Sequence, residues 1–370
     1  MTSPKRLLVR WRALPELKSH VDLIGWVAER MPAEVLILSN REIPWVENNS
    51  LLHVVRIKES FKLHPSTIRL KGWKEAALPF NPDMVLALDE AYCWSTHQLV
   101  RWASNRGIPS IYLSCQNIDR PLPPPFKWIE SRVLQGVTGG LFLNGEAEER
   151  ARRRGFKGEG KVIPLPVNPK DFPLLDAPDK ATNFRSGEGP MTVGYAGRLV
   201  PEKGLDTLIE ACAKTGDPLL LAGEGPDSER LKGLAKDLGV NCEWLGSAPS
   251  EKMPEVYSRM DVFVLPSLET PKWKEQFGRV LVEAMASGVP VVGSETGEIP
   301  RVIGEAGLLF SPAKADELAQ RLRDLKGSAE LQKDLQQKGL NRVRENFTLE
   351  KVGEKLLALL NDCLSHSESV

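Results

Sequence analysis

Short apolar runs rich in β-branched residues alternate along this chain with stretches of helical periodicity. A run that is apolar on both of its faces is typical of a parallel strand covered by helices on both sides. In the first half such runs predict strands at Leu7–Arg10, Glu34–Leu38, His53–Ile57, Met84–Leu88, Ile108–Leu113 and Gly140–Leu143. In the second half they predict strands at Thr192–Ala196, Leu219–Ala222, Cys242–Leu245, Val262–Leu265 and Val289–Val292. The alternation therefore predicts an α/β fold with two doubly wound parallel sheets.

The length supports a division into two domains. At 370 residues the chain exceeds the size at which one hydrophobic core usually stops growing. The stretch from Pro164 to Pro190 has the Pro, Gly and polar content of a linker between domains.

Composition excludes several classes of protein. Hydrophobic residues make up 41% and charged residues 26%, as in an ordinary globular protein, and no apolar run is long enough to span a membrane. The apolar stretches of the first thirty residues are broken by Pro15, Glu16, Lys18 and Asp22, which argues against a signal peptide and predicts a cytoplasmic protein. The five cysteines lack CxxC spacing, and the five histidines lack metal-ligand spacing. We expect free thiols and no metal site.

A net charge of zero conceals an asymmetry along the chain. Residues 1–165 contain 24 Lys and Arg against 17 Asp and Glu, a net of +7, so the remaining residues carry a net of −7. The basic half could lie on an anionic membrane or receive a phosphate-bearing acceptor; a solvated surface without a partner is the alternative. Its densest cluster, Arg150–Arg154, follows three glutamates; for part of this cluster, complementing a helix dipole is the alternative interpretation. No nucleic-acid partner is expected.

Two cations follow the strand that ends at Gly197. Arg198 and Lys203 lie five residues apart where open α/β sheets place their ligand crevice. Arginine offers a planar fork to phosphate oxygens and lysine a compact charge, so the pair suits a diphosphate leaving group. A surface turn followed by a surface helix is the alternative.

A helix is expected to begin after Gly278, with two glutamates placed around its start. Its free N–H groups can meet a phosphate or sugar oxygen. Glu275 precedes the helix and can reach sugar hydroxyls, while Glu283 lies inside it and can accept both hydroxyls of a ribose. Upstream, Gly223 and Gly225 allow a close backbone approach to a ligand or to a neighbouring loop, with a plain tight turn as the alternative.

In this order the elements resemble the nucleotide-sugar-binding lobe of the retaining glycosyltransferases of family 4, the glycosyl transferases group 1. The family has two glutamates separated by seven residues, here Glu275 and Glu283. The resemblance covers about 190–345 strongly and 1–165 by topology. It implies a GT-B fold, two facing Rossmann-like lobes with the active site in the cleft between them. The lobes would be 1–168 and 169–346, with a final helix within 347–370 packing back on the first lobe.

The resemblance also implies a reaction. A sugar would move with retention of configuration from a nucleotide-diphosphate sugar to a saccharide or lipid-linked acceptor, in polysaccharide or glycoconjugate synthesis, without cofactor or metal. Arg198, Lys203 and Glu275 would be catalytic. Nucleotide-sugar contacts would come from Gly197, Gly223, Gly225, Leu245, Gly246, Phe277, Gly278, Val280 and Glu283. Peripheral contact with the inner face of a membrane, through the basic lobe, would suit a lipid-linked acceptor.

The chain departs from the family at several positions. Residues 11–15, Trp-Arg-Ala-Leu-Pro, replace the usual Gly-Gly loop, and Gln116 and Asn117 stand near the usual His. We expect these two residues on the acceptor side, with Trp273 shaping the acceptor channel. The departures leave two rivals open: a nucleotide-sugar epimerase-like enzyme, and a non-catalytic nucleotide- or saccharide-binding subunit. The sequence does not identify the base or the sugar of the donor.

Overall fold

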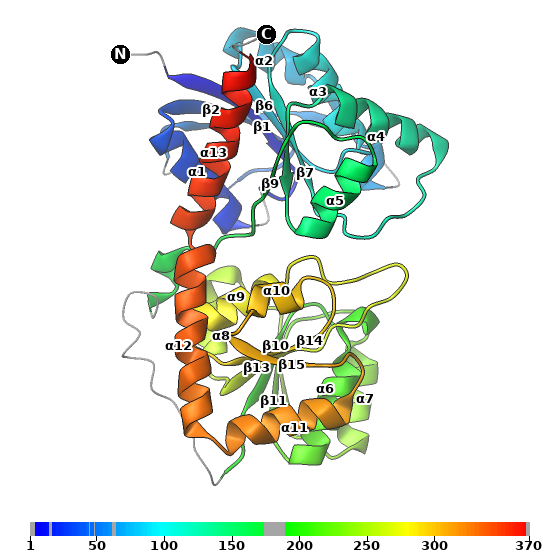
Figure 1. Ribbon diagram of the computed structural model, residues 1–370, viewed down its shortest axis with the longest axis vertical. Coiled ribbons are helices and arrows are strands. Elements are labelled where there is room, and N and C mark those ends of the chain that lie inside the picture. Colours follow the sequence, from blue (N-terminus) through cyan, green and yellow to red (C-terminus); the bar gives the residue numbers. More distant parts are fainter. Residues whose placement is uncertain are drawn as a thin grey trace. The chain divides into compact units, whose positions relative to one another are not determined.

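The computed structural model describes residues 4–14, 17–43, 45–47, 49–60, 64–173 and 189–367 (Figure 1). The chain divides into two compact units, unit 1 with Met1–Pro166 and Leu349–Val370, and unit 2 with Val167–Thr348. These bounds differ by two residues at each junction from the domain bounds expected from the sequence. Most of the predicted linker, residues 174–188, lies outside the described residues.

Unit 1 is built on a seven-stranded parallel sheet in the order β3-β2-β1-β6-β7-β8-β9. Its strands are β1 (Lys5–Trp11), β2 (Ala33–Ser39), β3 (Leu52–Arg56), β6 (Met84–Leu88), β7 (Ser110–Ser114), β8 (Gly139–Phe142) and β9 (Glu159–Val162). Its helices are α1 (Lys18–Arg30), α2 (Trp73–Phe80), α3 (Trp94–Ser104), α4 (Pro124–Gly136), α5 (Gly145–Arg153) and α13 (Leu349–Ser367). A short strand β4 (Lys58–Ser60) pairs antiparallel with β5 (Arg69–Lys71).

Both faces of this sheet are buried, which explains why its inner strands are continuous apolar runs. On β1, Leu7 and Val9 point into one core, which contains side chains of α1 and α13. Leu8, between them, points into the opposite core, formed with α2, α3 and α4. The alternation follows from the period of two along a strand.

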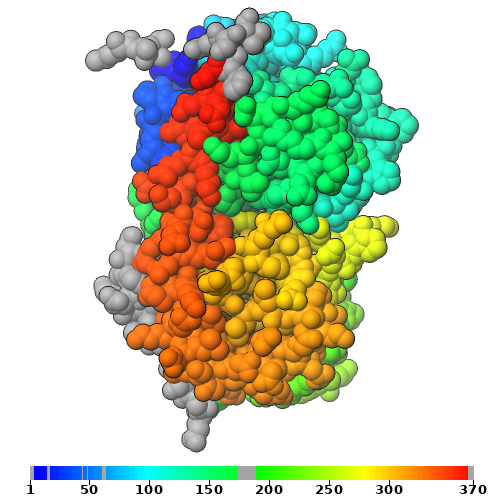
Figure 2. Space-filling view, viewed as in Figure 1, coloured from blue at the N-terminus to red at the C-terminus, as the bar shows by residue number. Residues whose placement is uncertain are grey.

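The C-terminal helix α13 completes unit 1. It contacts α1, β8 and β9, and Val352, Leu356, Leu360 and Cys363 are 0% exposed. The red helix lies between the blue α1 segment and the green segment that contains β9 (Figure 2). The last helix therefore belongs to the first unit although its sequence follows the second.

Unit 2 repeats the architecture with a six-stranded parallel sheet in the order β12-β11-β10-β13-β14-β15. Its strands are β10 (Val193–Ala196), β11 (Leu219–Ala222), β12 (Cys242–Gly246), β13 (Val262–Leu265), β14 (Val291–Ser294) and β15 (Gly307–Phe310). Its helices are α6 (Leu205–Thr215), α7 (Ser228–Asp237), α8 (Met253–Tyr257), α9 (Arg279–Ala286), α10 (Ile299–Ile303), α11 (Ala315–Lys326) and α12 (Ala329–Asn346). Across the described part of the chain, no helix combines the length and apolarity needed to cross a bilayer.

Each sheet has one place where the chain reverses the direction in which it adds strands. In unit 1 this switch point lies between β1 and β6, and in unit 2 between β10 and β13. Ligands of doubly wound sheets bind outside the carboxyl ends of the strands at such a point. Residues that follow these four strands are therefore the first candidates for a site.

All eleven predicted strands are present, with ends shifted by at most two residues. The α/β prediction of two doubly wound parallel sheets is confirmed. The sequence patterns did not predict the edge strands β9 and β15 or the short β4–β5 pair. The edge strand β9, Glu-Gly-Lys-Val, has no continuous apolar run, whereas β15, Gly-Leu-Leu-Phe, is apolar but only four residues long.

Candidate functional site

The loop after β10 places Arg198 at the switch point of unit 2. Gly197 has a φ of 146°, and the backbone beyond it is fixed by hydrogen bonds from Leu199 N to Glu224 O (2.9 Å) and from the Tyr195 hydroxyl to Arg198 O (2.9 Å). The Arg198 side chain is exposed. A backbone fixed by hydrogen bonds thus presents an exposed cation at the carboxyl edge of the sheet.

The neighbouring loop after β11 packs against it, backbone on backbone. A Cβ at Gly223, whose φ is 144°, would lie 1.9 Å from Gly197 O, and one at Gly225 would lie 2.1 Å from Leu199 O. Only glycine permits these contacts. The close approach expected at these glycines is therefore made to the neighbouring loop.

A cavity of about 280 Å³ opens at this edge of unit 2. The predicted catalytic residue Arg198 lines it, together with the predicted nucleotide-sugar residues Gly197, Gly223, Val280 and Glu283. Residues at 247–253 and the start of α9 close the other side. Tertiary structure thus gathers residues separated by more than eighty positions around one hollow.

Glu283 is oriented by two partners on the wall of that cavity. One carboxylate oxygen accepts from the Tyr257 hydroxyl at 2.8 Å, and the other faces Arg279 Nε at 3.1 Å. Burial, followed by the charge of Glu283, raises the pKa of Tyr257, so its hydroxyl stays a donor. A carboxylate has about four acceptor positions, so the Glu283 oxygens retain capacity for two vicinal hydroxyls.

Lys203 and Glu275 form a second cluster at the carboxyl edge of the sheet of unit 2. Lys203 Nζ lies 2.5 Å from Glu275 Oε2, which also accepts from the Ser267 hydroxyl at 3.0 Å. The same Nζ lies 5.0 Å from the centre of the Trp273 ring, a cation–π contact. An ammonium has three donors, so Lys203 can hold Glu275 and still meet a phosphate oxygen.

The segment that follows β14 fixes the backbone of Glu275. Glu298 N donates to Glu275 O at 3.1 Å. Gly297, with a φ of 54°, has no room for a side chain, because a Cβ there would lie 2.2 Å from the same oxygen. This contact therefore requires glycine at position 297.

The buried Tyr195 hydroxyl donates to Arg198 O and is influenced by the charges of both clusters. Burial raises the pKa of its hydroxyl, the charge of Glu275 raises it further, and that of Arg198 opposes the shift. Electrostatic influence from both residues places them within reach of one hydroxyl. Arg198 and Glu275 therefore belong to one carboxyl-edge site of unit 2.

Other predicted nucleotide-sugar residues lie around this edge in different ways. Leu245 and Gly246 end β12, where Gly246 O accepts from Gly223 N at 2.7 Å. Gly278, with a φ of 81°, begins α9 as expected. Phe277 is 4% exposed and packs its ring on Phe347, so this side chain belongs to the core and does not line the cavity.

At the switch point of unit 1 the structure gathers acids that the sequence reasoning missed. Arg12 pairs with Asp89 at 3.1 Å. Glu90 accepts from Cys115 N at 2.7 Å and from the Ser114 hydroxyl at 2.8 Å, and its burial raises its pKa to about 7. Two acids directly after the apolar run of β6 were the available sequence signal.

Gln116 and Asn117 follow β7 at the same edge of unit 1. Both are partly exposed, and Gln116 N donates to the Ser114 hydroxyl at 3.3 Å. The hydroxyl of Ser114 also binds Glu90. The two predicted acceptor-side residues are thus neighbours of the Glu90 carboxyl.

Arg279 and Tyr257, the two partners of Glu283, are among the residues of the unit 2 site that the sequence did not predict. Arg279 stands four positions before Glu283 on one helix, a spacing at which such pairs meet, so it could have been found. Tyr257 comes from α8, and no local pattern links it to α9. Within the described residues no group of three or more His, Cys, Asp or Glu side chains is arranged to hold a metal ion.

The basic cluster at Arg150–Arg154 proves to be internally neutralised. Arg150 is buried against Glu130 at 2.8 Å, and Arg154 binds Glu130 and Asp119. Arg152 and Arg153 pair with the glutamates four residues before them. The cluster therefore follows the helix-charge alternative and supplies little free positive charge.

The chain has two doubly wound parallel units, and a cavity lies at the switch point of the second. This architecture is the GT-B fold. The chain superimposes on a glycosyltransferase from Rickettsia africae with a TM-score of 0.76 at 18% identity, covering 98% of this chain and 99% of that one. Sucrose-phosphate synthase from Thermosynechococcus elongatus gives a TM-score of 0.75 at 20% identity, covering 98% of this chain and 100% of that one. These likenesses show the fold.

The family model of glycosyl transferases group 1 matches residues 177–342, so unit 2 belongs to that family. The chain is also 33% identical over 153 residues to a GDP-mannose-dependent alpha-(1-6)-phosphatidylinositol monomannoside mannosyltransferase of Mycobacterium tuberculosis. This match covers 38% of the chain and 40% of that relative. The chain spans less than two thirds of the length of the first curated relatives that it matches.

Proposed function

We propose that the chain is a retaining glycosyltransferase that moves a sugar from a nucleoside-diphosphate sugar to a saccharide or lipid-linked saccharide. One observation carries the proposal: Arg198 and the oriented Glu283 carboxylate line a single cavity at the switch point of unit 2. A cation for phosphate and a double acceptor for a ribose are the two groups that a nucleoside diphosphate needs. The family of unit 2 supports the same donor class.

In the proposed reaction the bond between the anomeric carbon and the diphosphate breaks, and negative charge grows on the leaving group. Arg198 and Lys203 stabilise that charge, because fixed cations act most strongly where charge develops. Glu275, held by Lys203 and Ser267, orients the sugar through its hydroxyls. The acceptor hydroxyl attacks from the face that the diphosphate leaves, and a phosphate oxygen takes its proton, so configuration is retained.

The acceptor side is proposed to lie at the carboxyl edge of unit 1. Gln116 and Asn117 offer amide donors and acceptors there, and Glu90 titrates near neutrality. Such groups suit the hydroxyls of a saccharide. The relative from Mycobacterium tuberculosis is named for a phosphatidylinositol mannoside acceptor, which supports a lipid-linked acceptor and peripheral contact with the inner face of a membrane.

Transfer is proposed to need no metal or other cofactor. Arg198 and Lys203 supply at the diphosphate the positive charge that a divalent ion supplies in metal-dependent transferases. Turnover in excess chelator, after removal of bound metal, tests this. Activity should be unchanged; loss with chelator and recovery with Mg²⁺ or Mn²⁺ would contradict it.

The first experiment identifies the donor by measuring the thermal stability of the protein in the presence of each of a panel of nucleotide sugars. A ligand that binds only the folded protein raises its apparent stability by RT ln(1 + [L]/Kd), about 2.7 kcal/mol at a hundredfold excess over Kd. A true donor should stabilise the wild type and not the Glu283→Ala variant at the same concentration. A donor that binds but is never transferred to any acceptor would point to a binding subunit instead.

Kinetics of Arg198→Gln and Lys203→Gln then test the proposed roles. Each substitution should lower kcat about a hundredfold or more with a smaller change in KM, since the charge appears in the transition state. The double variant should be strongly non-additive, because both cations serve one leaving group. The controls Lys232→Gln and Arg259→Gln, in exposed ion pairs of the same unit, should retain normal rates. Weak donor binding with a normal maximal rate would reduce both residues to phosphate anchors.

A further inference from the structure

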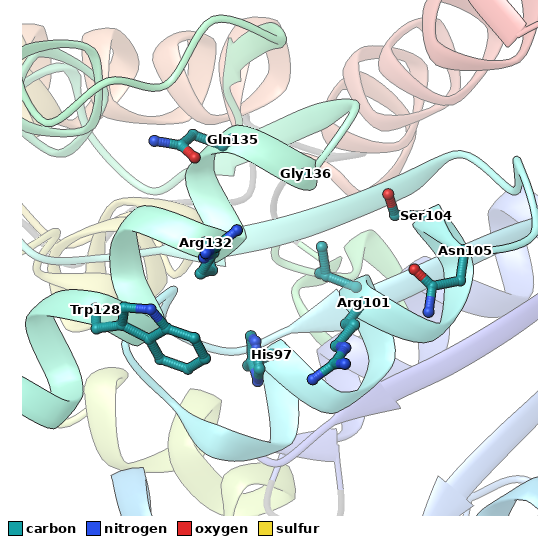
Figure 3. Close-up of a pocket in the computed structure, with 9 residues that line it drawn as sticks. His97, Arg101, Ser104, Asn105, Trp128, Arg132, Gln135 and Gly136 are labelled. Carbon is teal, nitrogen blue, oxygen red and sulfur yellow. The ribbon is translucent and has the colours of Figure 1, made fainter.

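A cavity of about 450 Å³ lies between α3 and α4 of unit 1, and no part of the proposed transfer reaction uses it. His97, Arg101 and Ser104 line it from α3, and Trp128, Arg132 and Gln135 line it from α4 (Figure 3). In this view Trp128 and His97 lie next to each other, with Arg101 and Arg132 near them. We call this site the α3–α4 pocket.

The α3–α4 pocket has a cationic lining without a counter-charge. No carboxylate lines it, and within the described residues no acid pairs with Arg101 or Arg132. The arginines of α5 in the same unit, by contrast, each pair with a glutamate or an aspartate. Like charges held near one another repel, and a bound anion removes that cost.

Arg101, Arg132 and His97 line the same cavity. The pKa of His97 is lowered first by burial and then by the charges of Arg101 and Arg132, so both guanidinium groups lie near one imidazole. The His97 ring is 5.3 Å from the Trp128 ring, and the Arg132 guanidinium carbon is 5.6 Å from the same indole. The positive groups therefore share one rim.

Trp128 is unusual for its exposure. Its side chain is 48% exposed, although large aromatic side chains are usually well buried. An exposed indole beside paired cations suits a ligand that joins an anionic group to an apolar or planar part. Gln135, Ser104 and Asn105 add neutral donors around the pocket.

We propose that the α3–α4 pocket binds the phosphate group of a ligand, through Arg101 and Arg132, with Trp128 against the adjoining part of that ligand. Guanidinium forks match phosphate oxygens bidentately and remain charged at every accessible pH. The ligand is either a soluble phosphate ester or the headgroup of an anionic lipid. The site is distinct from the diphosphate site of unit 2, so each can fail without the other.

The first arm of the test is calorimetric titration of the full chain with inorganic pyrophosphate. Wild type should show two sites, one in the pocket and one at Arg198 and Lys203. Arg101→Gln/Arg132→Gln should lose the pocket site, weakening it at least tenfold, and retain the other. Arg198→Gln/Lys203→Gln should show the reverse. Arg153→Gln, an exposed arginine of the same unit, should behave as wild type.

The second arm is co-sedimentation with vesicles of phosphatidylcholine, with and without phosphatidylglycerol. Binding only to the anionic vesicles, lost in Arg101→Gln/Arg132→Gln and retained in Arg153→Gln, assigns the pocket to a lipid phosphate. Loss of pyrophosphate binding with no vesicle binding by any variant assigns it to a soluble ligand. If the pocket variant matches wild type in both arms, the proposal is wrong. Both arginines are exposed, so the variant should keep the thermal stability of wild type.

Discussion

Two glutamates show how surroundings give one residue type different properties. Glu283 is held between a tyrosine hydroxyl and a guanidinium in unit 2. Glu90 accepts hydrogen bonds from neutral donors at the carboxyl edge of unit 1, and burial raises its pKa to about 7. The first is suited to accept hydroxyls, and the second can exchange a proton near neutral pH.

Tyr257→Phe should weaken binding of a nucleoside diphosphate about fivefold to tenfold, because the buried Glu283 oxygen loses its hydroxyl partner and its fixed orientation. Calorimetric titration measures the change. Tyr112→Phe is the matched control, since the buried Tyr112 hydroxyl has no hydrogen-bond partner among the described residues. Equal affinities for Tyr257→Phe and wild type would remove Tyr257 from the site.

The raised pKa of Glu90 predicts a pH dependence of stability. Between its ordinary value of 4.5 and about 7, the folded state keeps a proton that the unfolded state has released. The contribution of Glu90 is therefore fully present below pH 4.5 and is lost as pH rises through 7. Glu90→Gln should flatten this part of the stability profile, measured by urea unfolding of unit 1 across that pH range. An unchanged profile would show that Glu90 titrates normally.

Among the elements, the strand–loop–helix connections of unit 2 form the site, and their geometry depends on backbone contact. The loops after β10 and β11 touch at Gly197 and Gly223, and Gly297 touches the backbone of Glu275. Glycine at these positions lets two loops approach closely enough for both to reach one cavity. Arg198 and Glu275 are thus placed by neighbouring backbones as well as by their own.

Gly223→Ala should destabilise unit 2 by about 2 kcal/mol or more and impair nucleotide binding, because its Cβ would meet Gly197 O and its φ is 144°. Gly233→Ala is the control in the same unit. Gly233 lies in α7 with nothing near its Cβ position, so alanine should stabilise the protein by about 0.5–1 kcal/mol. Thermal unfolding distinguishes the two; equal effects would contradict the packing argument.

At the scale of the whole molecule, the helix α13 follows unit 2 in the sequence but packs in the core of unit 1. Helix α12 packs with α9 and α11 in unit 2, whereas α13, directly after it, packs in unit 1. Unit 1 is therefore completed by residues that follow unit 2 in the chain. The two cores are separate sets of side chains.

Leu360→Ala and Leu340→Ala form a matched pair for this organisation. Both leucines are 0% exposed, so each truncation should cost about 2–5 kcal/mol. Leu360→Ala should lower hydrogen-exchange protection in β1, β8 and β9, and Leu340→Ala in β14 and β15. Equal loss of protection in both units for either variant would show that they unfold as one.

Local patterns in the sequence were enough to predict the fold class, eleven of the strands, and the family of unit 2. A strand that is buried on both faces is apolar along its whole length, so it can be recognised in the sequence. A backbone with positive φ or a close contact requires glycine, so it can be recognised as well. For the same reason the sequence predicted the start of α9 at Gly278 and the order of the elements around Glu275 and Glu283.

Only the tertiary structure decided which partners these residues meet. The bonds of Glu283 to Tyr257, of Lys203 to Glu275, and of Arg150 to Glu130 join residues twenty or more positions apart. The raised pKa of Glu90 and the unpaired arginines of the α3–α4 pocket likewise depend on what neighbouring elements bring. Charge and burial act through space, so a pattern along the chain fixes the elements, while their packing fixes the electrostatics of the site.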